Sequence, residues 1–80
     1  FTDITVFPTV ADEFVRFQTG RFREMKGYQL FNASGAAIGA GVFRQETETL
    51  QTSNLPAGVY FVTFTQQDGA HLTKKLVVRH

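Results

Sequence analysis

Apolar and polar residues alternate with a period of two along most of this 80-residue sequence, and no segment repeats apolar residues at helical spacing over three turns. Gly, Pro, Asn and Asp interrupt the alternation at short intervals, as expected of turns. Successive side chains of a strand point to opposite faces, so this pattern is typical of strands that are buried on one face. The sequence therefore predicts an all-β chain.

Seven short strands follow from this pattern, over residues 4–7, 14–18, 28–31, 36–43, 46–52, 59–65 and 71–79. Residues 59–65 are largely apolar on both faces, which predicts a central strand, whereas residues 46–52 are mostly polar and typical of an edge strand. Pro8 is expected to end the first strand, because proline has no N–H for a central ladder. The spacing predicts an immunoglobulin-like antiparallel β-sandwich of about seven short strands.

Turn residues connect these strands. A hairpin turn is predicted over residues 32–35, where Gly35 can adopt a positive φ, and another over residues 67–69. Residues 55–58 predict a tight corner, after which Tyr60 follows in the sixth strand. Its phenol can reach back to a backbone group of the corner, as in the tyrosine corner of Greek-key sandwiches, or it can be an ordinary half-buried core side chain.

One domain, residues 1–80, is the organisation that this length allows. A chain of this size buries only about 60% of the surface that its unfolded form exposes. Its stability therefore requires close packing of the aromatic and branched side chains, and most of the nine Phe are expected in the core.

Charge and composition exclude several functions. The formal net charge is +1, and the basic residues are scattered apart from Lys74 and Lys75, which argues against binding a nucleic-acid backbone or an acidic membrane. No apolar run approaches the roughly 20 residues of a membrane-spanning helix. The absence of cysteine excludes disulfides, thiol catalysis and Cys-type zinc sites.

The sequence offers little for catalysis or for a cofactor. His71 and His80 begin and follow one predicted strand at an odd separation, so they point to opposite faces and cannot share a metal ion there. Glu46 and Glu48 share a face of the polar strand, which is typical of edge protection. Residues 35–41 are glycine-rich but lack the Lys-Ser/Thr of a phosphate loop. We expect no enzyme, no cofactor and no small-molecule substrate.

Four segments, over residues 4–13, 27–35, 50–62 and 73–78, carry motifs that match one family in order. They resemble the "v-x-v-Y/F-P-N-P-a-x-d", "v-x-i-y-n-x-x-G", "i-d-l-s-x-L-p-a-G-v-Y-f-v" and "t-K-K-i-v-v" patterns of the C-terminal sorting domains of the type IX secretion system. Thr9 and Val10 depart from the Asn and Pro of the opening pattern. The resemblance implies recognition residues at the matched positions Pro8, Gly35, Leu55, Pro56, Gly58, Tyr60, Lys74, Lys75, Leu76, Val77 and Val78.

The resemblance implies that the domain is a sorting signal for secretion. Such domains follow a covalently linked cargo that reaches the periplasm, are recognised by the type IX outer-membrane translocon, and are commonly removed by a sortase-like peptidase that joins the cargo to a lipopolysaccharide anchor. The implied location is the periplasm in transit, then the cell surface or the medium. Cleavage is expected before Phe1 or close to it.

The last predicted strand suits such recognition. Lys74 and Lys75 point to opposite faces, so only one is expected in solvent, and the other is expected at an edge or with its charged end snorkelling to the surface. An edge strand can be bound by strand addition, or the lysines can merely guard it against aggregation.

Two other functions remain open at this point. The chain could be a structural immunoglobulin-like spacer or a surface-adhesion module of a larger extracellular protein. A sugar-binding or other small-ligand module ranks below this reading and below the sorting domain. The sequence stops at His80, soon after the last motif, which favours a sorting domain because such a domain is expected at the C-terminus.

Overall fold

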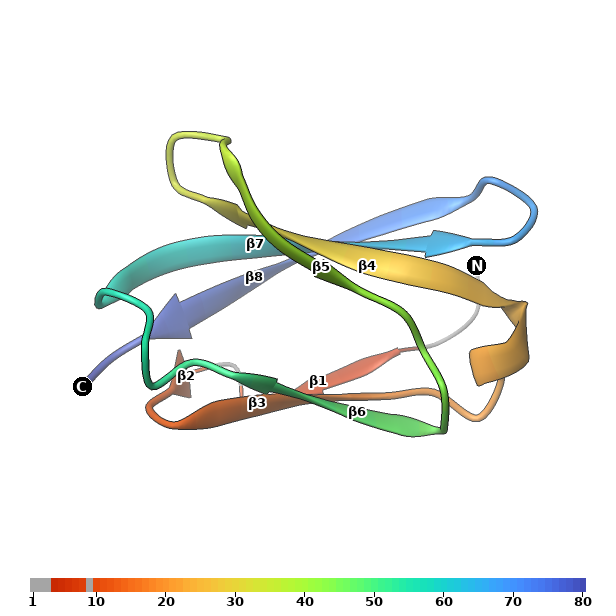
Figure 1. The fold of residues 1–80 in the computed structure, drawn as a ribbon, viewed down its shortest axis with the longest axis horizontal. Coiled ribbons are helices and arrows are strands. Elements are labelled where there is room, and N and C mark those ends of the chain that lie inside the picture. The colour runs from red at the N-terminus through yellow and green to blue at the C-terminus, as the bar shows by residue number, and fades with distance from the viewer. Residues whose placement is uncertain (1–3, 9) are drawn as a thin grey trace.

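The computed structural model describes residues 4–8 and 10–80 (Figure 1). Phe1 and Thr9 lie outside the described residues, and so does the expected cleavage point. The strands are β1 (Thr5–Phe7), β2 (Val10–Ala11), β3 (Phe14–Gln18), β4 (Met25–Asn32), β5 (Ala37–Gly41), β6 (Thr47–Gln51), β7 (Gly58–Gln66) and β8 (His71–Val78), with a 3-10 helix η1 (Phe22–Glu24) between β3 and β4. The all-β prediction is confirmed, and β2 is a strand that was not predicted.

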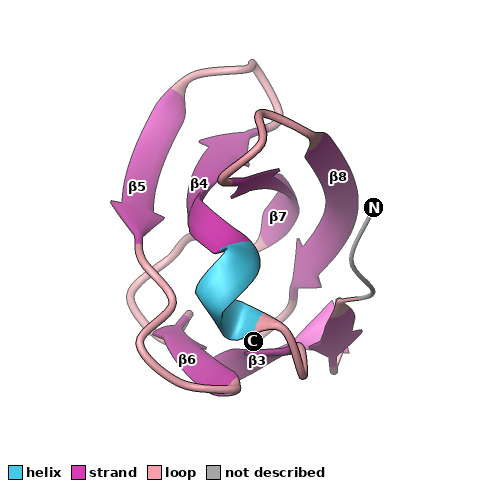
Figure 2. Cartoon of the chain, turned by 90° about the vertical axis from the view of Figure 1, so that its right-hand side faces the viewer, coloured by secondary structure: helices cyan, strands magenta, loops and turns pink. Residues whose placement is uncertain are grey.

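The strands form two sheets that pack face to face (Figures 1 and 2). The smaller sheet has the order β1-β3-β6, and the larger has the order β2-β8-β7-β4-β5. The predicted sandwich is confirmed. The apolar strand β7 lies in the middle of the larger sheet and the polar strand β6 lies at an edge, both as predicted. The pairs are antiparallel except that β2 runs parallel to β8, which corrects the expectation of a purely antiparallel sandwich.

The chain changes sheets at Pro8. β1 pairs with β3 in the smaller sheet, whereas β2 pairs with β8 in the larger one. The peptide bond between Phe7 and Pro8 is cis. Pro8 is exposed and lies between the two strands, so its missing N–H costs no ladder hydrogen bond, and the prediction that it ends the first strand is confirmed.

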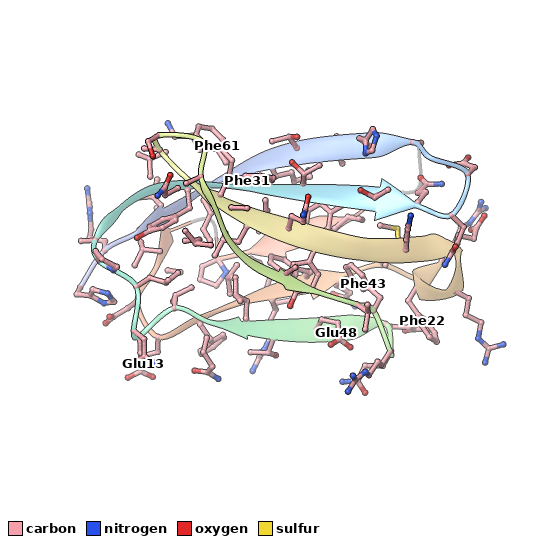
Figure 3. All side chains as sticks on the ribbon, turned by 45° about the horizontal axis from the view of Figure 1, so that its top comes forward. Glu13, Phe22, Phe31, Phe43, Glu48 and Phe61 are labelled. Carbon is pink, nitrogen blue, oxygen red and sulfur yellow. The ribbon has the colours of Figure 1, made fainter. Side chains whose placement is uncertain are left out.

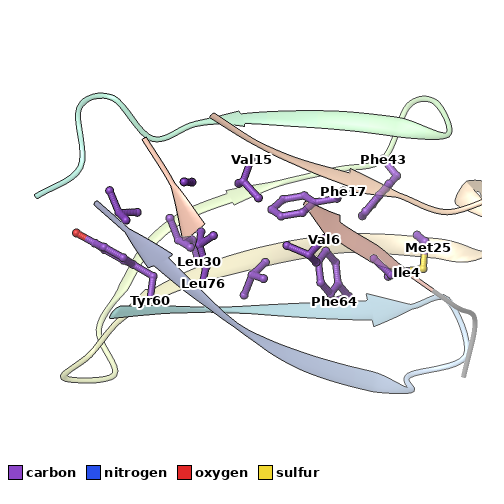
Figure 4. Packing of buried hydrophobic residues seen from close by; sticks show 13 residues of the cluster. Ile4, Val6, Val15, Phe17, Met25, Leu30, Phe43, Tyr60, Phe64 and Leu76 are labelled. Atoms are coloured by element: carbon purple, nitrogen blue, oxygen red, sulfur yellow. The ribbon is translucent and has the colours of Figure 1, made fainter. Parts of the chain in front are cut away.

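The core lies between the sheets and is centred on aromatic side chains (Figure 4). Phe17 packs edge to face against Phe64, with ring centroids 5.1 Å apart, and against Tyr28 at 4.9 Å. Phe43 extends this group, with its ring 5.9 Å from that of Tyr28. Such aromatic pairs add to the free energy gained by burying their area.

The expectation that most Phe side chains are buried is wrong for the described residues. Only Phe17, Phe43 and Phe64 are buried there. Five others are half-buried, and they lie at positions 7, 14, 22, 31 and 61. Two of these five lie on the outer surface of the larger sheet, where β-strand alternation turns them away from the core.

Two glycines allow β4 and β5 to approach each other closely. A Cβ atom on Gly27 would lie 2.6 Å from the carbonyl oxygen of Gly41, and a Cβ atom on Gly41 would lie 2.5 Å from the ring of Tyr28. The β4–β5 pairing also shifts register between Leu30 and Phe31. The two glycines therefore let the strands approach, and the missing side chain of Gly41 leaves room for the Tyr28 ring.

Candidate functional site

The final strand, β8, pairs with neighbours very unequally on its two sides. On one side it pairs with β7 from His71 to Val78. On the other side it pairs with β2 at Val77 and Val78 alone. On this second side, within the part of the chain that the structure describes, residues 71–76 therefore have no neighbouring strand. We call this stretch the open edge of β8.

The direction of the backbone groups along the open edge follows from hydrogen bonds at its two ends. Near the hairpin, the Gln66 N–H donates to the Ala70 carbonyl at 2.8 Å, and at the far end the Arg79 N–H donates to the Ala11 carbonyl at 2.8 Å. Antiparallel ladders alternate between residues that bond to the partner strand and residues whose groups point away. Thr73 and Lys75 therefore direct their N–H and C=O groups away from β7, toward the open edge.

The two lysines of this strand have different environments. Lys75 is exposed on the outer face of the larger sheet and lies opposite Phe61. Lys74 is half-buried on the inner face, opposite Val62. The prediction that they point to opposite faces, with only one fully in solvent, is confirmed. An inward-pointing charge on an edge strand opposes pairing with another sheet edge.

The other matched residues of β8 belong to the sandwich itself. Leu76 and Val78 are buried in the core. Val77 is half-buried on the outer face and lies between Val10 and Val59, its partners in β2 and β7. These three residues anchor the strand whose earlier part forms the open edge.

The corner before β7 is a tyrosine corner. The Tyr60 hydroxyl donates a hydrogen bond to the Pro56 carbonyl at 2.6 Å, and the side chain is buried. The alternative of an ordinary half-buried tyrosine is therefore wrong. Gly58 has φ of 158°, and Leu55 packs against the core from the corner. This hydrogen bond fixes the path of the chain into β7, because it satisfies a backbone carbonyl that lies outside the strand pairing.

The hairpin between β4 and β5 contains Gly35, whose φ is 90°. The Asn32 side-chain oxygen accepts hydrogen bonds from the N–H groups of Ser34 and Ala36, at 3.1 and 3.0 Å. The predicted turn is confirmed. In Figure 1 this hairpin, the corner and the end of β8 lie at the same end of the sandwich, whereas the β7–β8 hairpin lies at the opposite end. The two lysines lie between those ends, opposite Phe61 and Val62.

His80 contacts two distant parts of the chain, a role that was not predicted from the sequence. Its Nδ1 lies 2.8 Å from Asp12 Oδ1, and its Nε2 lies 2.7 Å from the Leu55 carbonyl oxygen. Both partners are acceptors, so both ring nitrogens must donate, which only the protonated imidazole can do. The hydrogen bond to Asp12, and then the one to Leu55, raises the pKa of His80 above 6.5.

This arrangement predicts that His80 stabilises the fold in acid and not in alkali. Because the folded-state pKa is raised, the contribution is complete below about pH 6.5, the unfolded pKa, and is lost as the pH rises through the folded pKa. We expect His80→Ala to lower Tm more at pH 5.5 than at pH 8.5, measured by thermal unfolding against the parent protein. An equal loss at both pH values would contradict the paired contact.

Other kinds of site find little support in the described residues. Residues 4–8 and 10–80 contain no group of three or more His, Asp or Glu side chains placed to hold a metal ion. Within the same residues, no helix has the length and apolar character needed to cross a membrane.

Comparison with known proteins agrees with this geometry. The family model described as "Secretion system C-terminal sorting domain" matches residues 5–79 of the 80-residue chain. The match therefore includes β1 and all of β8, and with them the tyrosine corner. Comparison with curated protein sequences finds no match. The chain belongs to the type IX secretion C-terminal sorting domains.

Proposed function

We propose that this domain is the sorting signal by which the outer-membrane translocon of the type IX system selects a covalently linked cargo. Family membership supports export to the cell surface or the medium. In this proposal the cargo precedes the domain and passes through the periplasm, and a sortase-like peptidase then cuts close to Phe1. The domain is the ligand and the substrate of this machinery and performs no catalysis itself.

The open edge of β8 is the observation that carries the proposed mode of recognition. The outward N–H and C=O groups of Thr73 and Lys75 can bond to an extended segment of a partner, which would add to the sheet as a further strand. β2 already pairs with β8 in this way at Val77 and Val78. An added strand would occupy the same side of β8 over residues 71–76.

Side chains would supply the specificity that backbone pairing lacks. Lys75 is exposed on the outer face of the sheet, and Lys74 is half-buried on the inner face. An added strand would therefore have one lysine beside each of its faces. A carboxylate on either face of the partner strand could pair with one of them. The competing explanation is that both lysines only prevent unwanted edge pairing, and this also follows from the edge position.

The double variant Lys74→Gln with Lys75→Gln tests the lysines. We expect it to stay folded by circular dichroism, because such polar substitutions usually change stability by only about 0.5 kcal/mol. We expect its export as a cargo fusion to fall, because two charge contacts with the partner strand are lost. Lys26→Gln with Arg44→Gln removes two exposed charges elsewhere and is the matched control. If the two variants were exported equally well, Lys74 and Lys75 would serve only to prevent unwanted edge pairing.

Thr73→Pro tests strand addition itself, in the same assay. It removes an N–H that points to the open edge, and proline is tolerated at such positions of edge strands. We expect a folded protein with impaired export. A folded Thr73→Pro variant that exports as well as the parent would contradict strand addition, whatever the lysine variant does.

A further inference from the structure

The outer face of the larger sheet carries an apolar patch at one end. The patch consists of Val10, Phe31, Val59, Phe61 and Val77, which are adjacent across four strands through the pairs Val10–Val77, Val59–Val77 and Phe31–Phe61. Val10 is 51% exposed and the other four are half-buried. Figure 3 shows Phe31 and Phe61 together on the larger sheet. We call these five residues the outer patch.

The same face of β7 and β8 is polar beyond the outer patch. Toward the β7–β8 hairpin, the outward positions hold threonines, and Thr63 and Thr73 share a hydrogen bond of 2.9 Å. Thr65 pairs in the same way with the His71 ring at 3.2 Å. Polar residues on the outward face are what a sandwich needs in water. Phe31 and Phe61 break that pattern, although a domain of this size gains most by burying its rings.

The charges around the outer patch are one-sided. Lys75 is exposed on the same face and lies directly opposite Phe61. None of the outward strand positions that the structure describes on this sheet carries a carboxylate. Asp12, which follows β2, is engaged by His80. A second copy docked through the same face would therefore bring Lys75 against residues that cannot pair with its charge.

We propose that the outer patch and Lys75 form a docking surface for a protein partner whose contact surface is apolar and carries a carboxylate. The five apolar side chains supply the area, and the lysine selects the acidic neighbour. Lys75 also belongs to the open edge of β8, so one partner can add a strand at the edge and cover the patch. This inference deepens the proposed function and rests on it, since the partner would belong to the export machinery.

The variant Val59→Thr with Phe61→Thr tests the docking surface. It continues the row of threonines on β7, so the strand and its inner face are preserved. We expect a folded protein whose export as a cargo fusion falls about tenfold or more, as for loss of central aromatic contacts. Phe14→Thr with Val42→Thr removes an aromatic and a valine outside the outer patch and should export normally.

The outcomes separate this inference from the proposed function. If the unaltered domain fails to export its cargo, the proposed function fails. If the unaltered domain exports and the folded Val59→Thr, Phe61→Thr variant exports equally well, the docking surface is overturned while the proposed function stands.

The class of partner needs its own measurement. A photo-crosslinking phenylalanine analogue placed at position 61 in exporting cells should form an adduct with an outer-membrane protein of the export machinery, and the same analogue at position 14 should not. The purified domain should sediment as a monomer and should not bind vesicles of phosphatidylcholine with phosphatidylglycerol. Dimers or vesicle binding that disappear in the Val59→Thr, Phe61→Thr variant would overturn the inference in favour of self-association or a lipid surface.

Discussion

Phe64→Ala is expected to leave the domain largely unfolded at 25 °C. Phe64 has no exposed surface, and its ring packs edge to face against Phe17 at 5.1 Å and lies 6.1 Å from that of Phe43. Removing a buried phenylalanine costs about 3–5 kcal/mol, because both the apolar area and the surrounding packing are lost. A core in a domain of this size rarely supplies more than about 3–5 kcal/mol, so the loss matches the whole stability.

Urea unfolding followed by circular dichroism measures this loss. Phe61→Ala is the matched control, because Phe61 lies on the same strand, three residues earlier and on the opposite face, where it is half-buried. We expect Phe61→Ala to lose about 1 kcal/mol and to remain folded. If both variants lost the same free energy of unfolding, the assignment of the inner and outer faces of β7 would be wrong.

Local patterns in the sequence were sufficient for much of this fold. The two apolar faces of residues 59–65 predicted the central strand β7, and the polar stretch around Glu48 predicted an edge strand. The corner sequence before Tyr60 gave, as one of two alternatives, the hydrogen bond that the structure has at 2.6 Å. These features depend on residues within a few positions of one another, so alternation and turn chemistry determine them.

Features that depend on distant pairing could not be predicted. β2 has only two residues and no alternation of its own, and it exists because Val10 and Ala11 pair with Val77 and Val78. The 3-10 helix η1 is a single turn, too short for a periodic signal. Composition also misled, because it treats every Phe alike, whereas Phe31 and Phe61 are turned outward by strand register.

Some features of the candidate site could likewise be predicted from local sequence patterns, and others could not. Alternation alone placed Lys74 and Lys75 on opposite faces of their strand, and the structure agrees. The length of the open edge depends on where β2 stops pairing, which no local pattern gives. The contacts of His80 span 68 and 25 residues along the chain, so they carry no sequence signal.

Export of a fused cargo is the most direct test of the central claim. A signal peptide, a fluorescent protein that folds in the periplasm and residues 1–80 would be joined in that order and expressed in a bacterium with a type IX system. We expect fluorescence at the cell surface or in the medium, and we expect it to remain in the periplasm when the domain is omitted or the translocon is deleted. Retention of the complete fusion in the periplasm, at the level of the cargo without the domain, would contradict the account.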